Sequence, residues 1–140
     1  MHAQGDEAMR KFSFKPVLEK EIVVHPNLNK VVKPLVFVSE DLYPGAKIWG
    51  HIYTIPKLDR EELKKIDSVP HTHEVDEIHV TYSREGAARY EKTIDGKTYL
   101  VESPSTSYVP AGVEHHIRWL EVKEPVTVIA IVLKGKYSPR

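Results

Sequence analysis

Most of the chain consists of short runs of β-favouring residues, many with alternating apolar and polar positions, and turn-forming residues separate these runs. Alternation with a period of two places apolar side chains on one face of a β-strand. The ten prolines and seven glycines lie mostly between the runs, where the chain has to turn. We therefore expect strands at Glu21–Val24, Val31–Val38, Lys47–Ile55, Glu77–Tyr82, Ala88–Ile94, Lys97–Glu102, Ser107–Val109, His115–Leu120 and Val126–Leu133.

Two local signals sharpen this pattern. Asp95-Gly96 predicts a two-residue hairpin, because a type I′ turn needs positive φ at both central residues. Asp59, with Glu62 three residues later, has the form of a capping box, so one short helix or helical loop is expected near residues 59–66. Many short strands joined by hairpins are typical of an all-β sandwich or barrel.

Length and composition limit the classes of protein that this chain can belong to. Its 140 residues suit one domain, so we expect a disordered N-terminus at residues 1–10 and a single β-barrel domain at residues 11–140. Basic and acidic residues balance at 20 each with no basic stripe, which argues against a nucleic-acid partner. No apolar run approaches the ~20 residues that cross a membrane, and no cysteine is present. We expect a cytoplasmic protein that binds a small molecule.

The histidines carry the clearest chemical signal. His71 and His73 are two residues apart, so on an extended strand both imidazoles point to the same face. Glu77 follows after three residues, enough for a turn that brings its carboxylate to the same point. His115 follows Pro110–Gly112, whose composition suits a tight turn before an inward-facing position.

Three imidazoles and one carboxylate suit a single divalent ion of iron, manganese, nickel, cobalt or zinc. Four ligands would leave two positions of an octahedral ion open. One carboxylate against a doubly charged ion leaves a net positive centre, which favours an anionic or enolisable small molecule. His116 alternates away from His115 and is expected at the surface or at an interface.

Five further residues are candidates for a pocket around this ion. His79 shares the face of Glu77, where it is either an acid–base group or a hydrogen-bonded structural histidine. Trp119 shares the face of His115, and Tyr108 lies just before the second histidine pair. His51 and Tyr53 are acid–base candidates if they face inward.

The orientation of the strand that carries His51 and Tyr53 stays open at this point. Trp49, His51 and Tyr53 alternate with Ile48, Gly50 and Ile52, and barrel interiors usually take the aliphatic set. An inward aromatic face would make Trp49 a pocket wall, whereas an outward one would form a dimer surface.

The spacing H-x-H-x3-E, followed by P-x-G-x-x-H, resembles the two motifs of the cupin superfamily. His71 to Glu77 match the first motif, with Gly86 closing it, and Pro110 to His115 match the second. The resemblance covers roughly residues 40–133. Lys65 and Pro104 stand where the family has glycine, and Trp119 stands where it has asparagine.

The resemblance implies a double-stranded β-helix, or jelly-roll barrel, with His71, His73, Glu77 and His115 in the metal-ligand positions. It also implies a homodimer. By the same resemblance, dioxygenase chemistry on a small oxygenated molecule ranks first, and isomerase or lyase chemistry ranks second. A non-catalytic cupin that binds or senses a small ligand is the alternative.

Overall fold

The computed structural model describes residues 12–20 and 24–137. The N-terminal residues 1–10, and most of the expected strand Glu21–Val24, lie outside this described part. Within it the strands are β1 (Val17–Leu18), β2 (Leu35–Val38), β3 (Trp49–Ile55), β4 (Glu77–Tyr82), β5 (Ala88–Ile94), β6 (Lys97–Glu102), β7 (Ser105–Val109), β8 (His115–Val122) and β9 (Val126–Val132).

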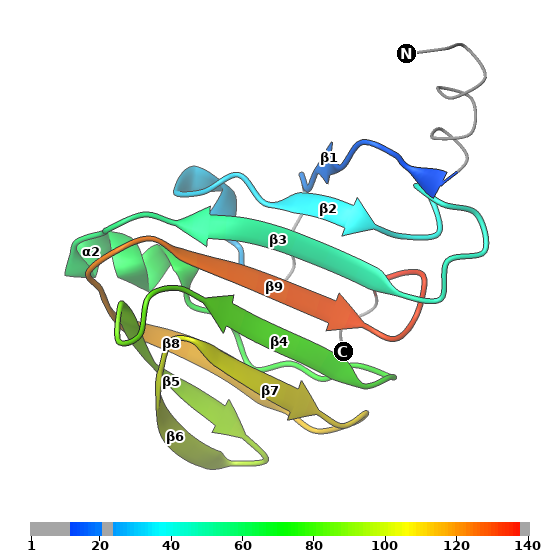
Figure 1. The fold of residues 1–140 in the computed structure, drawn as a ribbon. Coiled ribbons are helices and arrows are strands. Elements are labelled where there is room, and N and C mark those ends of the chain that lie inside the picture. Colours follow the sequence, from blue (N-terminus) through cyan, green and yellow to red (C-terminus); the bar gives the residue numbers. More distant parts are fainter. Residues whose placement is uncertain (1–11, 21–23, 138–140) are drawn as a thin grey trace.

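The strands form two antiparallel sheets. The larger sheet has the order β1-β2-β3-β9-β4-β7, and the smaller one has the order β6-β5-β8. Figure 1 shows β3, β9 and β4 side by side across the larger sheet, with the short helix α2 at one end. The crossovers between non-consecutive strands are those of a jelly roll, so the expected all-β fold is confirmed.

The hairpin between β5 and β6 turns where the sequence predicts. Asp95 has φ of 53° and Gly96 has φ of 76°, the positive values of a type I′ turn. Ile94 pairs with Lys97 on either side of the turn. This register decides which residues of β5 face the interior.

The expected helix is also present. α2 spans Arg60–Leu63 and continues as a 3-10 turn over Lys64–Ile66. The backbone N–H of Glu62 donates to Oδ1 of Asp59 at 2.9 Å, which caps the first turn. Leu63 and Ile66 are buried in the core, so this segment closes one end of the barrel.

One expectation needs correction, and the orientation of one strand that the sequence leaves open is defined. The strand expected over Val31–Val38 is limited to β2, because Val32 is buried in the core cluster beside Leu28 from a preceding 3-10 turn at Leu28–Lys30. The interior face of β3 is the aromatic one rather than the aliphatic one. Trp49, His51 and Tyr53 are all buried, whereas Ile52 is only half-buried.

Candidate metal centre

The two histidine motifs are joined through their backbones. His71 and His115 form an isolated antiparallel bridge, in which the N–H of each donates to the carbonyl of the other at 3.1 and 2.9 Å. The N–H of Gly112 also donates to the carbonyl of His73 at 2.8 Å, with Gly112 at a φ of 78°. The Pro110–Gly112 turn therefore docks directly on the first motif.

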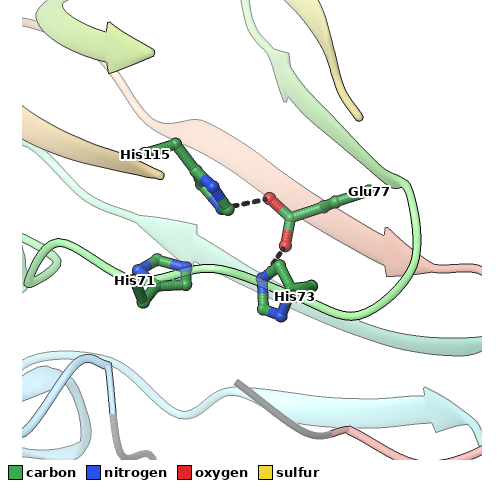
Figure 2. A group of neighbouring side chains, drawn as sticks. All are labelled: His71, His73, Glu77 and His115. Atoms are coloured by element: carbon green, nitrogen blue, oxygen red, sulfur yellow. Dashed lines mark ion pairs between the residues drawn. The ribbon is translucent and has the colours of Figure 1, made fainter. Parts of the chain in front are cut away.

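Four side chains converge on one point, as Figure 2 shows. His71, His73, Glu77 and His115 each offer one ligand atom, and these atoms all lie within 4.8 Å of one another. All four residues are buried. Nε2 of His73 lies 2.9 Å from Oε2 of Glu77, and Nε2 of His115 lies 3.2 Å from Oε1 of the same carboxylate.

The hydrogen bonds around the cluster leave its lone pairs pointing inward. Nδ1 of His71 donates to the carbonyl of Val69 at 2.6 Å, and Nδ1 of His115 donates to that of Val113 at 3.0 Å. A neutral imidazole that donates through Nδ1 has an unprotonated Nε2. Among the described residues, the buried Nε2 atoms of His73 and His115 have no neighbour to bond with other than the Glu77 carboxylate.

The protonation states fit a cation. Burial lowers the pKa of His71 to about 4, against the smaller opposing effect of its bond to Val69, so this ring stays neutral. Burial alone would raise the pKa of Glu77, but the contacts with His115 and His73 outweigh it and hold the pKa well below its usual range. Neutral imidazoles and an ionised carboxylate are the donors that first-row divalent metals prefer. The predicted ligand set is therefore a buried cluster that could hold one metal ion.

A cavity of about 20 Å³ lies against this cluster. A buried water needs roughly 10–15 Å³ on this measure, so the space admits one or two water-sized groups. Besides residues of the cluster, its walls include His25, His51, Tyr53, His79, Lys92 and Tyr137.

The three predicted acid–base residues all line this cavity. Nδ1 of His51 lies 3.0 Å from Oε1 of Glu19, and both side chains are buried. Burial raises the pKa of Tyr53, with smaller contributions from two nearby carboxylates, so its phenol keeps its proton. Burial, and then Lys92, lower the pKa of His79, which keeps this imidazole neutral.

The three predicted pocket walls lie elsewhere. Trp119 packs in the hydrophobic core against Tyr90, with ring centroids 4.9 Å apart. Trp49 is close to the site, stacked on His51 and Tyr137, but it borders an outer groove rather than the cavity. The prediction that these tryptophans wall the pocket is corrected, because facing inward does not fix how far along the strand a side chain lies.

The prediction that Tyr108 walls the pocket is also corrected, because its side chain is exposed on the outside of β7. Its hydroxyl donates to Oδ2 of Asp76, and Oδ1 of Asp76 accepts the N–H of Ala111 at 2.8 Å. These two bonds lower the pKa of the Asp76 carboxyl. Tyr108 and Asp76 therefore clamp the turn before His115 onto the loop before Glu77.

Sequence reasoning missed His25, Lys92 and Tyr137. Lys92 was within reach, because the hairpin register places it on the same face of β5 as Ala88 and Tyr90. His25 and Tyr137 come from the chain segments outside the main strands. No periodic pattern marks such segments.

Solved structures with a similar fold are found at low sequence identity. A chain from the crystal structures of two DMSP lyases has a TM-score of 0.58 and 14% identity, over 88% of this chain and 60% of that chain. A cupin-2 domain protein from Rhodospirillum rubrum has a TM-score of 0.56 and 12% identity, over 92% and 75% of the two chains. A polyketide cyclase from Streptomyces resistomycificus has a TM-score of 0.56 and 13% identity, over 93% and 80%.

These likenesses define the fold class. The chain has the cupin fold, as the resemblance of its two motifs implies. It spans less than two thirds of the DMSP lyase chain. No family model matches the sequence, and neither does any curated protein. Within the described residues, no helix combines the length and apolar character needed to cross a membrane.

Proposed function

We propose that this chain is a metal-dependent enzyme that acts on a small oxygenated molecule by proton transfer, as an isomerase or lyase does. The observation that carries the proposal is one cavity in which a four-residue metal cluster meets several proton-transferring side chains. His51, Tyr53 and His79 all reach this space. A site used only to store a metal has no need of them.

A divalent ion held by His71, His73, Glu77 and His115 would supply Lewis-acid polarisation of a substrate oxygen. The other side chains handle protons. A neutral His79 can accept a proton, and the protonated Tyr53 can donate one. Glu19, bonded to Nδ1 of His51, orients that ring and stabilises it when it gains a proton.

Dioxygenase chemistry is the second candidate. The observation that favours it is the ligand set, because three imidazoles and one carboxylate also suit ferrous iron. The polar cavity walls favour proton transfer over it, which reverses the order expected from the sequence resemblance. The similarity in fold to a lyase and a cyclase is compatible with this order, although a shared fold does not assign a reaction. The homodimer and the cytoplasmic location stay predictions.

The two candidates differ in what they consume. Metal-loaded protein is incubated in D2O with a panel of short 2-oxo acids, 2-hydroxy acids and β-diketones. Proton-transfer chemistry predicts deuterium incorporation or an elimination product by NMR, with no uptake of dioxygen at an oxygen electrode. The Tyr53→Phe and His51→Gln variants should lower the rate about 100- to 10,000-fold while metal content is unchanged.

His116→Gln is the matched control, because His116 lies on the other face of β8 from His115 and is only half-buried. Its rate should equal that of the wild type. Dioxygen uptake without deuterium exchange would replace the first candidate by the second. Metal-loaded protein that binds members of the panel but neither exchanges protons nor consumes dioxygen would indicate a binding or sensing protein.

A further inference from the structure

One lysine side chain lies in the interior of the barrel, where few groups can neutralise its charge. Lys92, in the middle of β5, is 3% exposed, and its side chain lines the cavity beside the metal cluster. A buried charge is costly unless it is paired. No carboxylate of the described residues forms an ion pair with Lys92, and Glu77, which acts on it at longer range, is already engaged by His73 and His115.

The metal would deepen this imbalance. A divalent ion with one carboxylate ligand carries a net charge of +1, so Glu77 would no longer offset the lysine. Apart from Glu77, none of the described residues that line the cavity carries a carboxylate, and Glu19, which lies outside it, is paired with His51. The loaded cavity would therefore place Lys92, whose pKa is lowered by burial, beside a positive metal centre with no anion between them, and a bound carboxylate would stabilise its ammonium form.

We infer that Lys92 anchors the carboxylate of the substrate, so that the site takes a short carboxylic acid whose second oxygen lies at the metal. This inference rests on the proposed function, whose site it shares. It names the substrate class that the metal cluster alone leaves open.

His79 supports the same assignment. Its Nδ1 atom is buried and has no hydrogen-bond partner among the described residues. His79 and Lys92 line the same cavity. A carboxylate has two oxygens, and Lys92 with an Nδ1–H of His79 would give each of them a donor.

The cavity limits the length of the acid. Its volume of about 20 Å³ admits only one or two water-sized groups, so a bound acid must displace wall side chains such as Tyr137, and the shortest acids need the least displacement. A 2-hydroxy or 2-oxo acid of two or three carbons is among the shortest acids with a carboxylate and a second oxygen group on adjacent carbons. The charge of Lys92 disfavours the binding of uncharged ketones or diols at this site.

The test uses glycolate and glycolamide, which have the same shape and differ in charge. Both are titrated by calorimetry into the full chain loaded with zinc, which has no redox chemistry. Glycolate should bind the wild type at least tenfold more tightly than glycolamide. Lys92→Met should weaken glycolate binding about 10- to 100-fold, the range expected for a charge-assisted hydrogen bond, and should leave glycolamide and zinc binding unchanged.

Lys97→Met is the matched control, because Lys97 lies on the same hairpin and is exposed. It should bind glycolate as the wild type does. Equal glycolate affinity in the wild type and Lys92→Met, with zinc bound in both, would overturn the inference and leave the metal site intact. If the wild type takes up no zinc, the proposed function fails, and metal-free protein decides this inference by the same comparison.

A second measurement does not depend on a variant that folds well. Wild-type protein carrying 13C at the ε carbon of lysine is titrated with each ligand, and the Lys92 signal is assigned by its absence in Lys92→Arg. Glycolate should shift this signal and glycolamide should not. A Lys92 signal that ignores saturating glycolate would contradict the inference.

Discussion

The interior of the barrel has two halves that the same strands build. At one end β3 presents His51 and β8 presents His115, both next to the metal cavity. Two steps or more along the same inward faces, β3 presents Ile55 and β8 presents Trp119, both in the hydrophobic core. The polar half holds the histidines and Glu77. The apolar half is a continuous cluster that includes Leu28, Leu63, Ile66, Tyr90, Val122, Val126 and Val128.

The difference separates stability from chemistry. The apolar half gains the hydrophobic free energy that holds two sheets together. The polar half buries groups whose desolvation is costly. These groups contribute little to the free energy of folding unless they are paired or bind a ligand. Substitutions in one half should therefore change unfolding, and substitutions in the other should change binding.

The largest expected effect on unfolding comes from the apolar half. Trp119→Ala removes a fully packed indole and should cost about 3–5 kcal/mol of the free energy of unfolding, measured by urea denaturation. Trp119→Phe should cost less, because Nε1 of Trp119 has no hydrogen-bond partner among the described residues. Metal bound per folded chain should be unchanged in both. A Trp119 variant that is as stable as the wild type but binds less metal would show that Trp119 does wall the pocket.

The next effect concerns His25, which lies where the two halves meet. Burial, followed by the nearby His51 and His71, lowers the pKa of His25 to about 3. The unfolded chain takes up a proton near pH 6.5, whereas the folded chain does so only near pH 3. Stability from this group is therefore full above about pH 6.5 and falls with pH below it, by about 1.4 kcal/mol per pH unit.

His25→Phe cannot make this contribution. Urea unfolding of metal-free wild type and variant between pH 7 and pH 4.5 should show that the difference in stability shifts steadily in favour of the variant as pH falls. Histidines that do not interact with His25 contribute equally in both proteins, and the smaller coupling of His25 to His51 and His71 is part of the difference. A difference that does not change with pH would mean that His25 is protonated in the folded chain.

A smaller effect is expected at the mouth of the polar half. The ring centroid of Tyr137 lies 4.5 Å from that of Trp49 and 5.2 Å from that of His73. Tyr137 lines both the metal cavity and an outer groove of about 650 Å³, and so separates the two. Tyr137→Ala should speed the removal of bound metal by a chelator about tenfold, because opening to solvent then needs no displacement of this ring. Tyr82→Ala removes an exposed tyrosine and should leave the rate unchanged.

The smallest effect lies outside both halves. Arg84 and Glu124 form an ion pair at 3.0 Å, with exposed fractions of 83% and 44%. Exposed pairs contribute little, so Arg84→Ala should change the free energy of unfolding by less than about 0.5 kcal/mol and should not change metal binding. A larger change in either would show that the surface is coupled to one of the two halves.

The contrast between the halves also explains what the sequence could predict. The four residues of the buried cluster were predictable because alternation along an extended chain puts His71 and His73 on one face, and because the two motifs resemble a known pair. The strands β4, β5 and β6 were predictable from alternation and from the Asp95-Gly96 turn. The alternation of side chains along a strand states whether a side chain faces inward.

This alternation does not state how far along the barrel axis a side chain lies. Trp119 has the same parity as His115 but lies two pairs further along β8, so it belongs to the core. Lys92 faces inward against the usual preference of lysine for the surface, and only a bound anion such as the proposed carboxylic acid would give its charge a partner. Tyr137 reaches the site from beyond β9, through tertiary contacts that no local pattern encodes.

The central claim is that four buried side chains hold one divalent ion, and cobalt(II) titration followed by visible absorption tests it most directly. The wild type should bind one ion per chain. His115→Gln should weaken binding by more than about 100-fold, beyond the usual cost of losing a residue that only supports a ligand. His116→Gln, the neighbouring change on the opposite face, should bind as the wild type does. Binding by His115→Gln as tight as that of the wild type, or no binding by the wild type, would contradict the account.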